Sequence, residues 1–307
     1  MKILYAGTAD FAVLPLKKLL EHGFEVCGVI TKPDMPKGRG MAMAFSPVKQ
    51  AATELGLPIF QPGKLDKSVL ELMEQLKPDM LIAVAYGKLI PEFMLNFPAL
   101  GAINVHGSIL PKYRGAAPIQ WSVLNGDKQA GVTTMYMDKG MDTGDIIDIY
   151  QTDILPYETA GQLYDRLSVQ GAQLLVKTLT DITGGKIHRT PQDNSIATQA
   201  PVITKEMSPI DWTKPAARII NRICGLNPWP SASTTANGKR VKIHAAVLTG
   251  ENGQGAPGTV LASREGTFLT MCGDGQIIAV TQIQFEGKRK MTPGEYLVGN
   301  PMIERFE

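Results

Sequence analysis

The sequence has few cysteines, and their spacing indicates neither metal binding nor disulfide bonding. The three cysteines, Cys27, Cys224 and Cys272, lie far apart, and none belongs to a CxxC pair. This spacing argues against a disulfide framework and against a cysteine-based metal site. We expect three reduced thiols buried in the core of a cytoplasmic protein.

Long hydrophobic runs are also missing. No apolar stretch approaches the ~20 residues that cross a bilayer, and the first residues, MKILYAGTAD, lack the apolar core of a signal peptide. The 307 residues are 44% hydrophobic and 20% charged, as in globular proteins large enough for two domains. The net charge of +2 is too small to indicate nucleic-acid binding by itself.

Several familiar catalytic motifs are absent as well. The four histidines show no HExxH spacing, so no metal centre is expected. There is no GxSxG motif, so an activated serine nucleophile is not expected either. The segment GTADFA follows the first apolar run but lacks the GxGxxG pattern, which argues against dinucleotide binding.

The chain does contain an alternation of apolar strands and amphipathic helices. Strands are expected at residues 2–7, 24–31, 79–87, 101–107, 131–138 and 145–154. Ser46 and Thr159 are expected to cap the helices that follow them. The alternation predicts right-handed βαβ units, and so a Rossmann-like α/β domain at residues 1–186 with a mostly parallel sheet and helices on both faces.

The pattern changes after residue 186. Residues 187–205 are polar and show no sustained period, so we expect an extended linker. A helix capped by Thr213 follows, and then short apolar segments separated by glycine-rich turns. This spacing predicts a small antiparallel, OB-like β-barrel at residues 206–307.

Two polar residues stand at the end of the apolar run AINVH. Ligands of parallel sheets bind beyond the carboxyl ends of the strands, and alternate residues of a strand face the same side. Asn104 and His106 are therefore expected to point together into a crevice. An equally simple interpretation is that both side chains satisfy local backbone groups.

The segment DKGMDTGDII adds three carboxylates, Asp138, Asp142 and Asp145, around two glycines. A carboxylate beside a histidine orients the ring and stabilises its charged form. The alternative is an ordinary solvated turn, because Asp and Gly are common turn residues.

Asn, His and Asp together suit acyl transfer between two amines. An amide can donate to the tetrahedral oxyanion, and a histidine can move protons between the attacking and the leaving nitrogen. A carboxylate can hold the histidine. This chemistry needs no nucleophilic Ser or Cys.

A long loop at residues 31–49, TKPDMPKGRGMAMAFSPVK, mixes basic residues with apolar ones. A loop of this length in a compact domain is usually functional or mobile. Its bases, which include Lys37 and Arg39, suit a phosphate-bearing partner.

With these segments in place, the sequence resembles the folate-dependent formyltransferases over essentially its whole length. The segments GTADFA, VAYGKLIP, GAINVHGSILPKYRGAAPIQ, GMDTGDII, IDW and NPWPSA occur in the family's order. The resemblance implies formyl transfer from 10-formyltetrahydrofolate to an amine, with no metal. It assigns the catalytic roles to Asn104, His106 and Asp142.

The resemblance also implies a folate-binding stretch. It comprises Ser108, Ile109, Leu110 and Pro111, together with backbone of Val84, Ala85, Tyr86 and Gly87. Exposed loop backbone can offer the donors and acceptors that a pterin ring needs.

The acceptor is harder to choose within this family. Members that formylate sugar-nucleotide amines share the catalytic trio and can carry a barrel, whereas those acting on glycinamide ribonucleotide would end near residue 186. The 31–49 loop is most similar to that of members acting on initiator methionyl-tRNA, where the residue matching Arg39 serves the acceptor end. We therefore expect tRNA binding by Lys37, Arg39, Arg218 and Arg222, and a monomer. A nucleic-acid-binding protein without catalytic activity is the alternative that a folate titration would exclude.

Overall fold

The computed structural model describes residues 1–37 and 42–307 and divides into two compact units. Unit 1 contains residues 1–118, 131–152 and 164–200, and unit 2 contains residues 119–130, 153–163 and 201–307. Two short segments, residues 119–130 and 153–163, therefore belong with the C-terminal residues.

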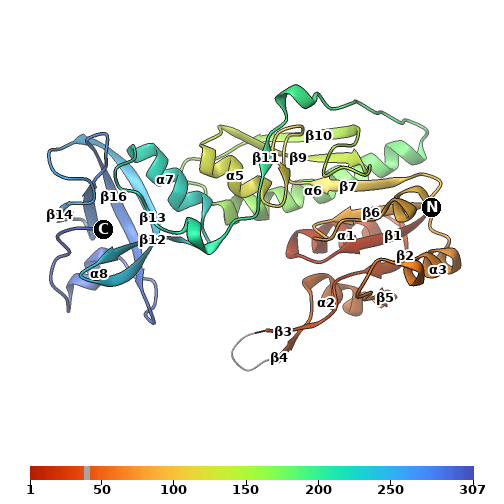
Figure 1. Cartoon of the computed structure of the whole chain (residues 1–307), viewed down its shortest axis with the longest axis horizontal. Helices are drawn as coiled ribbons and strands as arrows, with labels where there is room; N and C mark the ends of the chain where they lie inside the picture. The colour runs from red at the N-terminus through yellow and green to blue at the C-terminus, as the bar shows by residue number, and fades with distance from the viewer. Residues whose placement is uncertain (38–41) are drawn as a thin grey trace. The chain divides into compact units, whose positions relative to one another are not determined.

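Unit 1 is built on a seven-stranded sheet in the order β10-β9-β7-β6-β1-β2-β5 (Figure 1). The strands are β1 (Lys2–Gly7), β2 (Glu25–Ile30), β5 (Ile59–Phe60), β6 (Met80–Val84), β7 (Ala102–His106), β9 (Gln129–Tyr136) and β10 (Ile146–Asp153). Strands β1, β2, β5, β6 and β7 run parallel to one another, and β9 is antiparallel to β7. The mostly parallel α/β sheet expected from the sequence is confirmed.

Helices cover both faces of this sheet. They are α1 (Val13–Glu21), α2 (Pro47–Glu54), α3 (Lys67–Leu76), α4 (Glu92–Asn96) and α6 (Ala160–Thr183). Leu81 of β6 is buried in one cluster with Val69 of α3 and Met94 of α4. On the other face a methyl group at Gly171 of α6 would lie 3.3 Å from Val105 of β7. Within the described part of the chain, none of the helices is both long and apolar enough to cross a membrane.

Two helix starts follow the sequence expectation. The Ser46 side chain accepts a hydrogen bond from the backbone of Lys49, and Pro47 occupies the first turn of α2. The Thr159 hydroxyl accepts from the backbone of Gln162 at the start of α6, at 3.2 Å. Each side chain satisfies a backbone N–H group that has no partner within the helix.

The long loop after β2 contains a short hairpin of β3 (Met35–Lys37) and β4 (Ala42–Ala44). Lys49 holds the base of this hairpin through an ion pair with Asp34 and lies 4.2 Å above the Phe45 ring. The side chains of Met35, Met43 and Phe45 are at least half exposed. Arg39 lies outside the described residues.

Unit 2 contains a five-stranded antiparallel sheet in the order β12-β13-β16-β15-β14. The strands are β12 (Ala232–Ala236), β13 (Lys239–Asn252), β14 (Val260–Arg264), β15 (Thr267–Met271) and β16 (Gln276–Phe285), and the helices are α5 (Pro118–Asn125), α7 (Ala216–Gly225) and α8 (Pro293–Leu297). Backbone hydrogen bonds join Glu307 to Thr235 of β12, and Glu304 to Val260 of β14. One segment thus pairs with both edge strands, which fits a small barrel-like domain.

The expected cap of α7 is wrong. Thr213 does not begin this helix, because its hydroxyl donates to the carboxylate of Asp211, 2.5 Å away. Pro215 occupies the N-cap position, and the first helical N–H, that of Ala216, donates to the carboxylate of Asp274 at 3.2 Å. The helix is therefore capped from a distant turn rather than by a neighbouring residue.

Candidate active site

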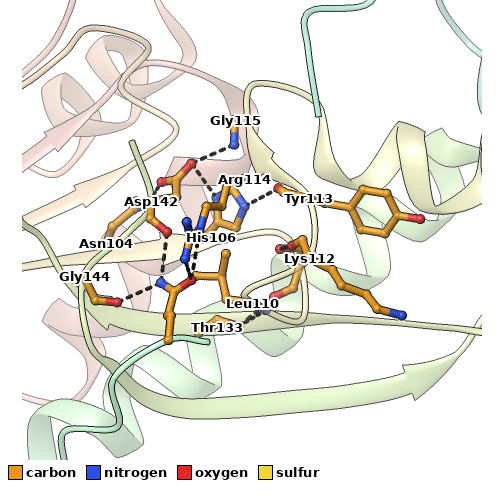
Figure 2. A network of polar contacts seen from close by, with 12 residues as sticks. Asn104, His106, Leu110, Lys112, Tyr113, Arg114, Gly115, Thr133, Asp142 and Gly144 are labelled. Carbon is orange, nitrogen blue, oxygen red and sulfur yellow. Dashed lines mark hydrogen bonds and ion pairs between the residues drawn. The ribbon is translucent and has the colours of Figure 1, made fainter. Parts of the chain in front are cut away.

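The carboxyl end of β7 carries two of the expected catalytic side chains. The pairing of β7 with β6 places Asn104 beside Ala83, and strand alternation puts Asn104 and His106 on one side (Figure 2). Asn104 Nδ2 lies 3.2 Å from Oδ1 of Asp142, and His106 Nδ1 lies 3.6 Å from Oδ2. The structure thus brings the three residues of the expected trio together.

The Asp142 carboxylate is fixed by backbone as well as by side chains. Its Oδ2 accepts a hydrogen bond from the N–H of Gly115 at 2.9 Å (Figure 2). Asp142 adopts a left-handed backbone conformation with φ +55°, which Asp tolerates better than most residues. A Cβ at Gly144 would lie 1.9 Å from the carbonyl oxygen of Tyr136, so this loop can pack against β9 only with glycine there.

The other two carboxylates of the segment make different contacts. Asp138 Oδ1 accepts from the backbone of Gly140 and from the hydroxyl of Thr143, as an ordinary turn does. Asp145 offers its backbone carbonyl to the N–H of Tyr136. Asp142 is the one whose carboxylate faces both Asn104 and His106.

The contacts of His106 define which ring nitrogen carries the proton. Nε2 lies 2.9 Å from the carbonyl oxygen of Tyr113 (Figure 2). A carbonyl can only accept, so Nε2 is the donor, and the neutral ring has its lone pair on Nδ1. Nδ1 faces the Asp142 carboxylate, which would form an ion pair with the ring once Nδ1 binds a proton. His106 is 5% exposed, so Nδ1 and the Asp142 carboxylate face each other in a largely buried environment.

The turn after His106 contains the expected folate-binding residues. The Ser108 hydroxyl donates to the carbonyl of Lys112 at 2.6 Å and closes the turn. Thr133 of β9 makes two hydrogen bonds to this turn. The Thr133 hydroxyl donates to the carbonyl of Ser108 at 2.7 Å and accepts from the N–H of Leu110 at 3.2 Å. Ser108 and Leu110 are buried, and Ile109 and Pro111 are partly exposed.

The second expected folate-binding stretch follows β6, the strand next to β7. Val84 is buried at the end of β6, whereas Ala85 and Gly87 are exposed. The Ala85 carbonyl accepts a hydrogen bond from the N–H of Ala9 at 3.4 Å, and the Tyr86 carbonyl accepts from the hydroxyl of Thr8 at 2.9 Å. The Tyr86 ring is buried in the core, and this burial raises the pKa of its hydroxyl. The phenol therefore stays neutral at physiological pH.

The expected tRNA-binding residues lie in different parts of the fold. Lys37 belongs to β3 in unit 1, and Arg218 and Arg222 belong to α7 in unit 2. Arg218 is exposed. The Arg222 guanidinium donates to the carbonyls of Pro209, at 2.9 Å, and Met207, and burial lowers its pKa. Arg222 thus makes contacts that stabilise unit 2.

Two polar residues near the trio were missed by the sequence analysis. Arg114 is 6% exposed and donates to the side-chain oxygen of Gln192, which in turn contacts the Asp142 loop. Arg114 lies inside the family-like segment PKYRG, so the sequence offered a signal for it. Gln192 lies in the expected linker, where nothing in the local sequence marks it.

Thr133→Val should lower the free energy of unfolding by about 1–3 kcal/mol, because the buried N–H of Leu110 and the carbonyl of Ser108 lose their partner. Urea denaturation followed by circular dichroism measures this loss. Thr53→Val, at an exposed helix position, is the matched control and should change little. Equal stabilities for the two variants would contradict the support assigned to Thr133.

Among the described residues, no group of three His, Cys, Asp or Glu side chains is arranged to hold a metal ion. The trio itself contains a single carboxylate and a single imidazole, with an amide as the third member. Side chains of these kinds can form hydrogen bonds and transfer protons.

Comparison with known proteins agrees with this geometry. The family model described as formyl transferase matches residues 1–179, and that of the formyl transferase C-terminal domain matches residues 202–301. The chain is 45% identical to the methionyl-tRNA formyltransferase of Alkaliphilus oremlandii, over 98% of this chain and 97% of that protein. It is 44% identical to the one of Caldanaerobacter subterraneus, over 99% and 98%.

Solved structures show the same fold at lower identity. An N-formyltransferase from Helicobacter canadensis, in complex with folinic acid and dTDP-3-aminofucose, superposes with a TM-score of 0.70 at 24% identity, covering 91% of this chain and 98% of that one. HypX from Aquifex aeolicus superposes with a TM-score of 0.67 at 20% identity, over 98% of this chain and 48% of that one. On the sequence matches, which extend over both units, the chain belongs to the methionyl-tRNA formyltransferase family of formyl transferases.

Proposed function

We infer that this protein transfers a formyl group from 10-formyltetrahydrofolate to the α-amino group of methionyl-tRNA. The observation that carries this inference is the 45% identity to a methionyl-tRNA formyltransferase over 98% of the chain. The meeting of Asn104, His106 and Asp142 at one point of unit 1 supplies groups that suit the reaction.

The reaction moves one carbon between two nitrogens. The amine of the methionyl group attacks the formyl carbon, a C–N bond forms, and the carbonyl oxygen becomes an oxyanion. When the oxyanion collapses, the bond between the carbon and N10 of the folate breaks. The attacking nitrogen loses a proton and N10 gains one, so the products are N-formylmethionyl-tRNA and tetrahydrofolate.

The trio can serve each of these steps. One N–H of the Asn104 amide bonds to Asp142, and the other can donate to the oxyanion. His106 Nδ1 can take the proton from the attacking amine and return it to N10. Asp142 holds the ring and balances its charge during that transfer.

We place the folate beside the loops that follow β6 and β7. The proposed contacts are Ser108, Ile109, Leu110 and Pro111, with backbone of Val84, Ala85, Tyr86 and Gly87. Adjacent strands bring these two stretches together at the carboxyl edge of the sheet, where parallel sheets bind their ligands.

For the tRNA, we propose contacts from two regions. Lys37 and Arg39 belong to the 31–49 loop, and Arg218 and Arg222 belong to α7. We assign RNA binding to residues 206–307, catalysis to residues 1–186 and a connecting role to residues 187–205. Of the two arginines of α7, Arg218 is the stronger candidate because Arg222 already bonds two carbonyls. Initiator tRNA as the acceptor, a cytoplasmic location and a monomeric state are proposed with this function.

The proposal is tested by one assay. Purified protein is given 10-formyltetrahydrofolate and charged initiator methionyl-tRNA, with a sugar-nucleotide amine as competitor, and formylated products are separated. Formylmethionyl-tRNA as the main product is the expected result. Formylation of the sugar amine alone would reject the tRNA assignment but keep the reaction class, and the absence of any transfer would reject both.

Arg39→Ala should weaken use of methionyl-tRNA and make it less salt-dependent. If the guanidinium neutralises one phosphate, its loss lowers the slope of log K against log salt by about 0.7–0.9. Steady-state kcat/KM at several salt concentrations measures the slope, and folate affinity should barely change. Lys67→Ala is the control, because Lys67 is an exposed base on α3. An unchanged salt slope for Arg39→Ala would remove this residue from the RNA contact.

A further inference from the structure

The residues between the end of α6 and unit 2 form a strap, residues 190–200, across the candidate site. Its backbone pairs with Ile146 just after the Asp142 loop, through two bonds of 2.9 Å with Thr190. It also pairs with β8 (Arg114–Gly115) through β11 (Gln199–Ala200), and the N–H of Arg114 donates to Thr198 at 2.8 Å. The strap therefore contacts both loops that fix the Asp142 carboxylate.

Gln192 makes the side-chain contacts between these loops. Its Oε1 accepts from Nε of Arg114 at 3.1 Å and from Nη2 at 2.8 Å. Its Nε2 donates to the backbone carbonyl of Asp142 at 2.9 Å and to that of Gly144 at 2.7 Å. All four bonds are within ordinary hydrogen-bond distance.

The orientation of this amide is set by its partners. A guanidinium can only donate, so the oxygen of Gln192 must face Arg114, and the NH₂ group must face the two carbonyls. Arg114 is 6% exposed, and its other side-chain acceptor is the amide oxygen of Asn194 at 2.8 Å. Reversing the amide would leave a buried charge facing two donors, which is costly.

The two carbonyls that Gln192 holds belong to the residue with the catalytic carboxylate and to the glycine two positions later. The two hydrogen bonds from Gln192 thus hold the backbone of Asp142 where it adopts its left-handed conformation, with φ +55°. The direction of the Asp142 side chain follows from that backbone. A shift of about 1 Å between reacting groups can cost about 10²-fold in rate.

We propose that Gln192 is a positioning residue that keeps the Asp142 carboxylate in contact with His106 and Asn104. This proposal rests on the formyl transfer inferred above, because it assigns Gln192 a role in that reaction. Gln192 itself contacts neither His106 nor Asn104 in any bond described above. It acts through the backbone of the 142–144 segment.

The sharpest variant is Gln192→Glu. A carboxylate keeps the acceptor for Arg114 and gains an ion pair with it, so the strap stays attached to β8. The NH₂ group that held the loop is replaced by an oxygen, which repels the carbonyls of Asp142 and Gly144. Gln199→Glu, at an exposed position on the same strap, is the matched control for the added negative charge.

Three measurements are made on both variants and on the wild type. Thermal unfolding reports stability, steady-state kinetics separate kcat from KM, and folate binding is titrated directly. The Gly115 amide is followed by NMR with glycine-selective ¹⁵N labelling, because it donates to the Asp142 carboxylate and reports its place. The NMR measurement needs no substrate, so it can be interpreted whether or not the proposed reaction is detected.

We expect Gln192→Glu to remain folded at a somewhat lower unfolding temperature, because the ion pair with Arg114 offsets only part of the two lost hydrogen bonds. It should bind folate normally and lose about 10²-fold in kcat. Its Gly115 amide should shift and exchange faster with solvent, and Gln199→Glu should match the wild type throughout. An unmoved Gly115 amide, or a kcat equal to that of the wild type, would overturn the proposal. A wild-type protein that transfers no formyl group would instead reject the proposed function. The Gly115 result would then still test whether Gln192 fixes the position of the Asp142 carboxylate.

Discussion

His106→Ala should lower kcat for formyl transfer by about 10²–10⁴-fold, the usual contribution of a general acid–base residue. The reason is the position of Nδ1. The bond of Nε2 to Tyr113 leaves Nδ1 as the nitrogen that can bind a proton, and Asp142 stands 3.6 Å away to balance the charge. Without the ring, the attacking amine must lose its proton to water. The measurement is single-turnover transfer to methionyl-tRNA at saturating folate.

A control is needed because the alanine also removes the hydrogen bond between His106 and the Tyr113 carbonyl. Folate titration and thermal unfolding of His106→Ala should show that the site and the fold remain. His188→Ala, at an exposed histidine, should keep the wild-type rate. Near-wild-type turnover by His106→Ala would take this residue out of the mechanism.

The placement of Asn104 and His106 at the end of β7 could be predicted from the sequence, because it depends only on rules for a single strand. An apolar strand in a parallel sheet is followed by a ligand-binding edge, and residues two apart share a face. Those two statements place Asn104 and His106 together without any knowledge of the rest of the chain. They do not choose among Asp138, Asp142 and Asp145, since that choice depends on where a flexible-looking loop packs. The family resemblance pointed to Asp142, and the contacts of its carboxylate now support that choice.

The strap could not be predicted, because its partners are distant in the sequence. Gln192 lies 50 residues from Asp142 and 78 from Arg114, and residues 187–205 have no periodicity to suggest burial or pairing. Helix α5 was missed for another reason. Its apolar residues do not keep to one face, so the segment PIQWSVLN shows no helical period.

The helix cap at Thr213 illustrates the same limit. A threonine before a helical pattern usually caps it, and Ser46 and Thr159 behave in that way. At α7 a carboxylate from residue 274 reaches the first turn instead, because the turn before β16 folds against it. Local sequence rules name a plausible cap, and tertiary contact decides which group serves.

Asn104→Asp should reduce kcat by about 10²–10³-fold, because a donor to the oxyanion becomes an acceptor, and such a donor contributes about 3–4 kcal/mol. The substitution keeps the size of the side chain, so packing changes little. It also places a second carboxylate beside Asp142. In the wild type, Oδ1 of Asp142 lies 3.2 Å from Nδ2 of Asn104. Two like charges at that distance repel, and one of them tends to bind a proton.

The double variant Asn104→Asp, Asp142→Asn separates these two effects. It restores one amide and one carboxylate in contact, so the thermal stability lost in Asn104→Asp should return. Catalysis should stay low, because the amide that faces the formyl oxygen remains replaced and His106 now faces a neutral group. Both variants are compared in kcat and in unfolding temperature. If Asn104→Asp alone kept the wild-type kcat, Asn104 would not stabilise the oxyanion, and the roles within the trio would have to be assigned anew.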